Sequence, residues 1–125
     1  MPPIAGAFRT VGARTFYADS LLKLGDMLLR LRDYKGALAR YERMAEVTRS
    51  LANDHPAVAT RWKWATSQDR IGETMFWIGG RASSLPHFRH GEEELERLLD
   101  EAPSDALRTY YKSVRSRSEQ IARMD

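Results

Sequence analysis

Apolar residues recur at helical spacing along most of this chain. The first stripe consists of residues three or four positions apart, a spacing that places side chains on one side of a helix. Its members are Tyr17, Leu21, Leu24, Leu28 and Leu31. The pattern predicts a helix from Arg14 to about Arg32, with this stripe facing the core.

Two more helices follow before residue 80. The second is expected to begin at Asp33, carry Tyr41 among its core residues, and end before the turn residues at 53–56. Asp is a favoured residue at helix starts, and Asn, Asp and Pro together favour a turn. The third should start beyond Pro56 and close at the glycine pair 79–80.

The same signals predict a fourth and a fifth helix. The fourth should begin at the serines 83 or 84 and end at Pro103, and the fifth should run from Ser104 or the next residue through Ile121. Pro86 is expected in the first turn of the fourth helix, because a proline further in removes a backbone hydrogen bond. No segment alternates as a strand does, so the predicted fold class is all-α.

The sequence repeats itself at an offset of 47 residues, which matters because a repeat determines the architecture. The matched pairs are Arg14 and Arg61, Tyr17 and Trp64, Leu24 and Ile71, Gly25 and Gly72, Leu38 and Leu85, Tyr41 and Phe88, and Pro56 and Pro103. These pairs divide the chain into repeat 1 (14–60) and repeat 2 (61–107). A closing helix (108–125) continues as a third copy if one residue is deleted. Residues 1–13 carry two prolines and two glycines and are expected to form a loose arm.

Two of these matches have a physical reason. A glycine inside a helix costs about 1 kcal/mol relative to alanine. Gly25 and Gly72 therefore predict that a neighbouring helix comes too close for a side chain, with Tyr41 and Phe88 filling the space beside the contact. Arg32 lies in the turn between the first two helices, at a position where glycine is the usual residue.

The repeated residues resemble the tetratricopeptide repeat, over positions 14–124. The matching residues are Leu24-Gly25, Ala37, Tyr41 and Pro56 in the first copy, and Ile71-Gly72, Ser84, Phe88 and Pro103 in the second. A standard unit has about 34 residues, so the longer unit here is similar to the long-helix bacterial variety. The resemblance implies a right-handed α-α superhelix of two helix pairs and a C-terminal capping helix.

The resemblance also implies a groove, lined by the first helix of each repeat, that binds a peptide or helix of another protein. Positions at i, i+3, i+7 and i+11 share the side of each helix that would face this groove. The candidate groove residues are Asp19, Leu22, Asp26, Arg30, Asp69, Glu73, Phe76, Trp77 and Arg115. Carboxylates dominate the candidate residues on the first helix of each repeat, so a ligand with basic residues is expected. Alternatively, these charges form a solvated face and the aromatic residues pack in the core.

The predicted function is a protein-interaction adaptor without catalysis, metal or cofactor. The alternative is a nucleic-acid-binding protein that uses basic and aromatic residues of the last helix. These residues are Arg108, Tyr110, Tyr111, Lys112, Arg115, Arg117 and Arg123. Three acidic residues on the same helix make this alternative the weaker of the two.

Composition limits the number of domains, the cysteine chemistry and the cellular location that the chain can have. The chain has 125 residues, 42% hydrophobic and 30% charged, which fits one ordinary globular domain, and its net charge is only +3. The absence of cysteine excludes disulfides, cysteine-ligated zinc and thiol nucleophiles. No apolar run is long enough for a membrane span or a secretory signal, so a cytoplasmic protein is expected.

Three further expectations concern chemistry and assembly. His87, His90, Glu93 and Glu94 are spaced like metal ligands on a helix, but Pro86 and Gly91 do not favour a rigid site, so no metal is expected. No nucleophile motif or phosphate-binding loop accompanies the paired carboxylates, so no enzyme activity is expected. Two repeats are few for a stable array, which favours self-association or a larger assembly.

Overall fold

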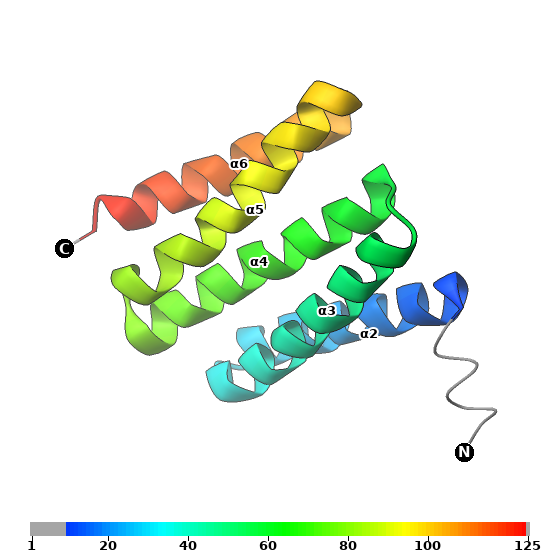
Figure 1. Ribbon diagram of the computed structural model, residues 1–125. Helices are drawn as coiled ribbons and strands as arrows, with labels where there is room; N and C mark the ends of the chain where they lie inside the picture. The colour runs from blue at the N-terminus through cyan, green and yellow to red at the C-terminus, as the bar shows by residue number, and fades with distance from the viewer. Residues whose placement is uncertain (1–9, 125) are drawn as a thin grey trace, which may run out of the picture.

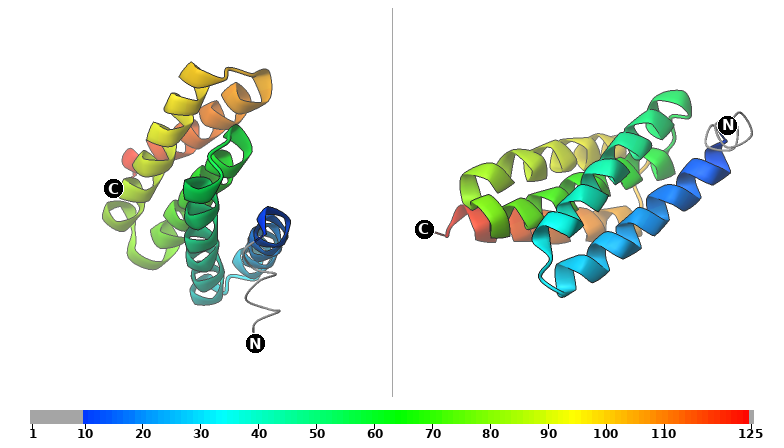
Figure 2. Two further views of the ribbon diagram at one scale, coloured as in Figure 1. Left: turned by 45° about the vertical axis from the view of Figure 1, so that its right-hand side comes forward. Right: turned by 90° about the horizontal axis from the view of Figure 1, so that it is seen from below.

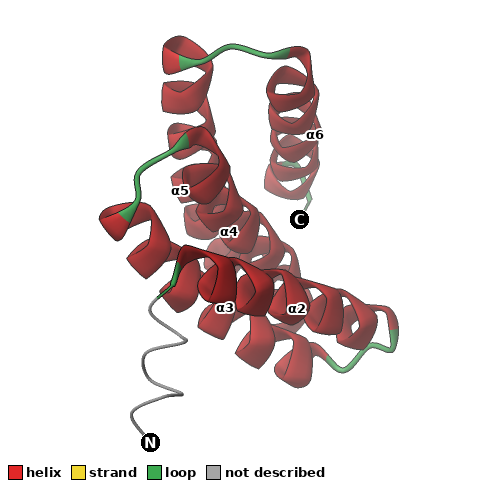
Figure 3. Cartoon of the chain, turned by 90° about the vertical axis from the view of Figure 1, so that its right-hand side faces the viewer, coloured by secondary structure: helices red, strands yellow, loops and turns green. Residues whose placement is uncertain are grey.

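The computed structural model describes residues 10–124, and over this range the chain is all-α. Its helices are α2 (Val11–Arg30), α3 (Tyr34–Asp54), α4 (Val58–Gly79), α5 (Arg81–Glu101) and α6 (Asp105–Ala122). The described residues contain no strand, and short loops join the helices (Figures 1 and 3). The prediction of an all-helical chain is confirmed.

The helices form a row in which each packs antiparallel against the next along the chain. The packed pairs are α2 with α3, α3 with α4, α4 with α5, and α5 with α6, while α2 and α4 touch lightly. Figures 1 and 2 place α2 at one end of the row and α6 at the other. The row therefore has two end surfaces as well as the faces along its length.

Side chains at the predicted positions begin two of the helices. The Asp33 carboxylate accepts the backbone N–H of Gly36 at 3.0 Å, and the Ser104 hydroxyl accepts that of Leu107 at 3.1 Å. Each satisfies a donor that a helix start leaves unpaired. Helix α2 starts at Val11, so residues 11–13 are helical and that part of the predicted arm is wrong. Residues 1–9 of the arm lie outside the described residues.

The turn between α2 and α3 places Arg32 in the left-handed region, with φ of 63°. The Arg32 N–H donates to the Leu29 carbonyl at 3.0 Å, and the Asp33 N–H donates to the Leu28 carbonyl at 2.9 Å. These two bonds define a helix end that usually carries glycine at the left-handed position. The sequence position that was expected to prefer glycine therefore has a conformation in which an arginine is strained.

Helix α5 begins earlier than predicted. Gly80 alone separates α4 from α5, with φ of 84°, and α5 starts at Arg81. Pro86 therefore lies beyond the first turn, and the expected start at residues 83–84 is wrong. The Ser84 hydroxyl instead donates to the Gly72 carbonyl at 2.7 Å, which ties α5 to α4. The carbonyl of Ala82, which Pro86 leaves without a helical donor, belongs to an exposed residue, so water can reach it.

Contacts between helices recur at the offset of 47 residues. Arg14 pairs with Asp54 at 2.8 Å, and the equivalent Arg61 pairs with Glu101 at 2.6 Å. A Cβ on Gly25 would lie 2.5 Å from Tyr41 Cε1, and a Cβ on Gly72 would lie 2.9 Å from Phe88 Cδ2. The predicted close approach at both glycines is confirmed.

The core consists of three clusters between neighbouring helices. One contains Ala18, Leu21, Met44 and Val47 of α2 and α3; the second contains Ala37, Tyr41 and Ile71 of α3 and α4; the third contains Ala65, Phe88, Leu95, Leu98, Leu107, Val114 and Ile121 of α4, α5 and α6. Leu24 and Leu31, which the sequence places in the core stripe, are 39% and 71% exposed. For these two residues the core prediction is wrong, because they lie on the side of α2 that faces away from α3.

Candidate interaction groove

Helices α2, α4 and α6 are linked by ion pairs that run across one face of the row. Lys63 of α4 pairs with Asp19 of α2 at 2.8 Å, and Arg70 pairs with Asp26 at 2.9 Å. Arg117 of α6 pairs with Asp69 of α4 at 2.5 Å. We call this surface the α2–α4–α6 face, and it corresponds to the groove expected from the sequence.

The middle of this face contains a partly buried network of charges, here called the ionic cluster: Asp26, Asp69, Arg70 and Arg117. Asp69 is fully buried and binds both Arg70, at 3.0 Å, and Arg117. A buried carboxylate is tolerated only when it is paired and hydrogen-bonded. The cluster therefore joins all three helices and serves the fold directly.

Two tyrosine hydroxyls complete the hydrogen bonding of the ionic cluster. The Tyr41 hydroxyl donates to Asp26 at 2.5 Å, and the Tyr110 hydroxyl donates to Asp69 at 3.3 Å. Burial, together with the bond to Asp26, raises the pKa of Tyr41 far above its ordinary value, so this tyrosine stays protonated. Asp26 thus has partners on α3 and α4, and Asp69 has partners on α4 and α6.

These contacts change the expected electrostatics of the groove. Asp19, Asp26 and Asp69 were predicted to meet a basic ligand, but each already binds a cation of the protein. Among residues 10–124, Glu73 is the predicted groove carboxylate that forms no ion pair. Burial raises the pKa of Glu73, and the nearby Arg117 opposes this while Asp69 adds to it. A ligand cation would therefore find its unpaired carboxylate at Glu73.

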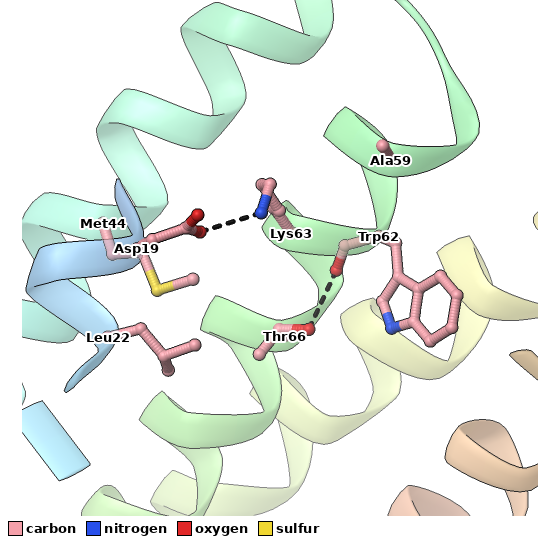
Figure 4. Close-up of a pocket in the computed structure, with 7 residues that line it drawn as sticks. All are labelled: Asp19, Leu22, Met44, Ala59, Trp62, Lys63 and Thr66. Atoms are coloured by element: carbon pink, nitrogen blue, oxygen red, sulfur yellow. Dashed lines mark hydrogen bonds and ion pairs between the residues drawn. The ribbon is translucent and has the colours of Figure 1, made fainter. Parts of the chain in front are cut away.

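One hollow lies between the N-terminal halves of α2 and α4, and we call it the Trp62 hollow. It measures about 280 Å³ and is lined by Asp19, Leu22, Met44, Ala59, Trp62, Lys63 and Thr66 (Figure 4). The ion pair of Asp19 and Lys63 spans it, and the Thr66 hydroxyl donates to the Trp62 carbonyl at 3.0 Å. The predicted groove residues Asp19 and Leu22 are thus found side by side here.

A second hollow lies near the C-terminal ends of α2 and α4, and we call it the Trp77 hollow. It measures about 410 Å³ and is lined by Leu29, Arg30, Arg32, Tyr34, Glu73 and Trp77. The Trp77 ring stacks on Tyr34 with a centroid distance of 6.1 Å and meets Phe76 edge-on at 5.3 Å. Trp77 nevertheless remains 57% exposed. Arg30, Glu73 and Trp77 are therefore brought together, as the helical spacing predicted, whereas Phe76 packs against the core cluster of α4, α5 and α6 and does not line the hollow.

Sequence reasoning missed two residues of the Trp77 hollow. Tyr34 was not among the candidate groove residues, yet it is half-buried and supports the ring of Trp77. Arg32 was considered only as a turn residue, and its exposed side chain lines the hollow. The left-handed turn that positions both residues lies at Arg32, the position where the sequence analysis expected glycine.

Arg115 does not join the other predicted groove residues. It binds Glu119 at 3.0 Å and accompanies Glu96 of α5 at 3.9 Å. Its groove position assumed a one-residue deletion in the third copy, but the contacts of α6 follow the undeleted offset. Arg70 binds a carboxylate of α2, and Arg117, 47 residues later, binds one of α4. At the undeleted offset Arg117 is the counterpart of Arg70, and Ser116, not Arg115, is the counterpart of Asp69.

The basic side chains of α6 are largely engaged with acids. Arg108 pairs with Asp105 at 3.0 Å, Arg115 and Arg123 approach Glu119, and Arg117 binds Asp69. Ion pairing lowers the positive charge that a helix presents to phosphates. This arrangement gives no support to the nucleic-acid alternative.

The histidines do not form part of a metal-binding group within residues 10–124, where no three His, Asp or Glu side chains converge suitably. His87 lies 3.3 Å from the Gln68 amide oxygen, and Glu94 is bonded to Arg61.

Within residues 10–124, none of the helices combines the length and the apolar character that crossing a bilayer requires.

Comparison with known proteins identifies no relatives. No protein-family model matches the chain, and neither curated proteins nor solved structures gave a match. The function is therefore inferred from the geometry of the α2–α4–α6 face.

Proposed function

We propose that this chain is a tetratricopeptide-like interaction module that binds a peptide or helix of another protein on the α2–α4–α6 face. In this proposal the helices form a right-handed superhelix of two helix pairs closed by α6. The recurrence of helix contacts at an offset of 47 residues supports such an arrangement. The module acts as an adaptor without catalysis.

The exposed Trp77 is the observation that carries the proposal. Tryptophan is among the residues that most often dominate binding energies, usually in a pocket rimmed by less important contacts. Here its ring is held by Tyr34 and Phe76 but more than half of it meets solvent, beside the unpaired carboxylate of Glu73. A ligand with an apolar side chain would cover the exposed ring of Trp77, and a lysine or arginine beside that side chain would pair with the carboxylate of Glu73.

The ionic cluster positions this site. Arg70 and Arg117 tie α2, α4 and α6 at one level, with the Trp62 hollow toward one end of α4 and the Trp77 hollow toward the other. A ligand lying along α4 would therefore cross a rigid, charge-neutralised middle between two partly apolar hollows. Rigid positioning lowers the ordering cost of binding.

The test uses the full chain as bait in an extract of the source cell. The groove variant carries Glu73→Gln and Trp77→Ala, because neither residue belongs to the ionic cluster. A matched control carries Glu42→Gln and Met124→Ala, which also remove an exposed carboxylate and an exposed apolar side chain. Asp26 and Asp69 are left unchanged, since their loss would leave Tyr41 and Arg117 without their carboxylate partners.

We expect at least one protein that is retained by the wild type and the control and lost with the groove variant. The purified partner should then change the tryptophan fluorescence of the wild type and not that of the Trp77→Ala chain. Equal retention by both variants would contradict the proposal. Tight oligonucleotide binding at physiological salt, with no protein retained, would favour the nucleic-acid alternative instead.

A further inference from the structure

The outer side of α2 is apolar and is not covered by any other described residue. Phe16 is 77% exposed and Met27 is 51% exposed, beside Leu24 and Leu31. Together with Ser20, these residues follow one another at steps of three or four and therefore share one side of the helix. We call this surface the α2 outer patch: Phe16, Ser20, Leu24, Met27 and Leu31.

The three central positions of this patch are buried in the two later helices of the row. At offsets of 47 and 94 residues, the counterparts of Ser20, Leu24 and Met27 are Ser67, Ile71 and Thr74 on α4 and Val114, Ser118 and Ile121 on α6, all buried. Ile71 clusters with Ala37 and Tyr41 of α3, and Val114 clusters with residues of α5. On α4 and α6, then, this side receives a preceding helix.

The opposite end of the row has a different character. On α6, the positions that correspond to the α5-facing side of α4 carry exposed polar residues, which are Arg108, Lys112, Arg115, Glu119 and Arg123. A polar outer surface is what closes an array of helical repeats. The α6 end is closed in this way and the α2 end is not, so the α2 outer patch has the character of an interface.

Charge indicates the kind of helix that fits this patch. On α2 the charged residues beside it are Lys23 and Arg30, both exposed and without an ion pair among residues 10–124. Asp19 and Asp26 of the same helix face α4, where Lys63 and Arg70 neutralise them. Acidic residues on a partner would meet these two cations without competition.

Two occupants from this chain itself fit less well. In a symmetric dimer the patches of two copies would face each other across a two-fold axis near the centre of the patch. The two Lys23 side chains would then lie close together and repel each other. The acidic α5 of a second copy cannot serve either, because its apolar side is covered by α4 and α6. Residues 1–9 contain no Asp or Glu to offset Lys23 and Arg30.

We propose that the α2 outer patch docks an amphipathic helix of another protein, with its apolar side on Leu24 and Met27 and acidic residues over Lys23 and Arg30. The docked helix takes the place on α2 that α3 takes on α4. This interaction uses a different apolar surface from the α2–α4–α6 face and shares with it only Arg30, which also lines the Trp77 hollow, so either interaction can fail without the other.

The test uses two fluorescent synthetic peptides and the full chain. Both peptides are amphipathic helices with the same leucine-rich side; one has glutamates beside it and the other has lysines. The variants are Leu24→Asp with Met27→Asp, which makes the patch polar, and Lys23→Glu with Arg30→Glu, which reverses its border. The control, Lys35→Glu with Arg40→Glu, makes the same reversal on exposed residues of α3. All four residues of the two patch variants are at least partly exposed, and circular dichroism checks that each variant is folded.

We expect the glutamate peptide to bind the wild type about tenfold more tightly than the lysine peptide. The polar variant should lose this binding, the border reversal should invert the preference, and the α3 control and the Glu73→Gln/Trp77→Ala groove variant should bind as the wild type does. Equal binding of both peptides, or binding by neither, overturns the proposal.

Two further measurements test the other occupants. Light scattering should give a monomer, and a concentration-dependent dimer that disappears in the Leu24→Asp/Met27→Asp chain would assign the patch to a second copy. Replacing Ile4 and Phe8 by Asp in the full chain should leave peptide binding unchanged. A large gain in binding on that replacement would assign the patch to residues 1–9. Either result would overturn the proposal that an acidic helix of another protein occupies the patch.

Discussion

Replacing Gly25 by alanine should destabilise the protein, although the same change in a helix normally stabilises by about 1 kcal/mol. The new Cβ would lie 2.5 Å from Tyr41 Cε1 and 2.9 Å from Cδ1 and Cζ, well inside an ordinary contact distance of about 3.5–4.0 Å. The ring cannot easily move, because Tyr41 is fully buried and its hydroxyl is bonded to Asp26. Overpacking costs about 1–3 kcal/mol, and this contact belongs at the upper end.

The net loss from Gly25→Ala is therefore about 2 kcal/mol, or roughly 8 °C in Tm for a domain of this size. Gly72→Ala should lose less, because the nearest Phe88 atom is 2.9 Å away and that ring has no hydroxyl bond to hold it. Gly12→Ala is the control: its Cβ meets nothing within 4 Å, so the variant should gain up to about 1 kcal/mol.

Urea unfolding followed by far-UV circular dichroism measures all three variants. Adding Tyr41→Leu to Gly25→Ala should cost less than the sum of the two single changes, because the leucine vacates the space that the new methyl needs. A Gly25→Ala protein as stable as the wild type, or a Gly12→Ala protein that loses as much, would refute the packing argument.

Three other changes test separate features. Arg32→Gly should raise Tm, because relief of the left-handed strain, about 1–2 kcal/mol, exceeds the added freedom of glycine in the unfolded chain, about 0.5–1 kcal/mol; a lower Tm would contradict this. Glu73→Gln should raise Tm near neutral pH. The raised pKa means that the folded state holds the proton more tightly, so stability falls as pH rises through the ordinary pKa toward the folded one. Its advantage should vanish below about pH 4, where Glu73 is protonated in both states, and a constant difference from acid to neutral pH would exclude this cause. Asp69→Asn should cost about 3–5 kcal/mol in urea unfolding, because Arg117 loses its carboxylate in a buried site; a loss under 1 kcal/mol would show that the ionic cluster is dispensable.

The sequence predicted the helices because their signals are local. Apolar spacing, Asp33, Ser104 and the glycine pair 79–80 each act within a turn or two of the backbone. The start of α5 was missed for a related reason. Two adjacent glycines can both adopt positive φ, and only the packing of α5 on α4, through Ser84 and Gly72, selects Gly80 and places Pro86 inside the helix.

The site was predicted only in part, because helical spacing places a residue on its own helix and not against another. It brought Arg30, Glu73 and Trp77 together correctly. It could not reveal that Asp26 and Asp69 are neutralised, since Arg70 lies 44 residues from Asp26 and Arg117 lies 48 from Asp69. Leu24 and Leu31 were misplaced for the same reason. The apolar stripe of α2 is wide enough to contact two neighbouring helices, and the sequence of α2 does not show whether both helices are present.

The packing of each helix mainly on its neighbours along the chain also bears on how the protein folds. A contact between adjacent helices closes a loop of only one or three residues, so little chain entropy is lost before packing begins. Helical proteins with such local contacts fold in microseconds to milliseconds. Because stability in such a row is a sum over neighbouring interfaces, partly folded molecules should contain unbroken runs of helices, and the α3–α4–α5 segment, packed on both sides, should be the last to open.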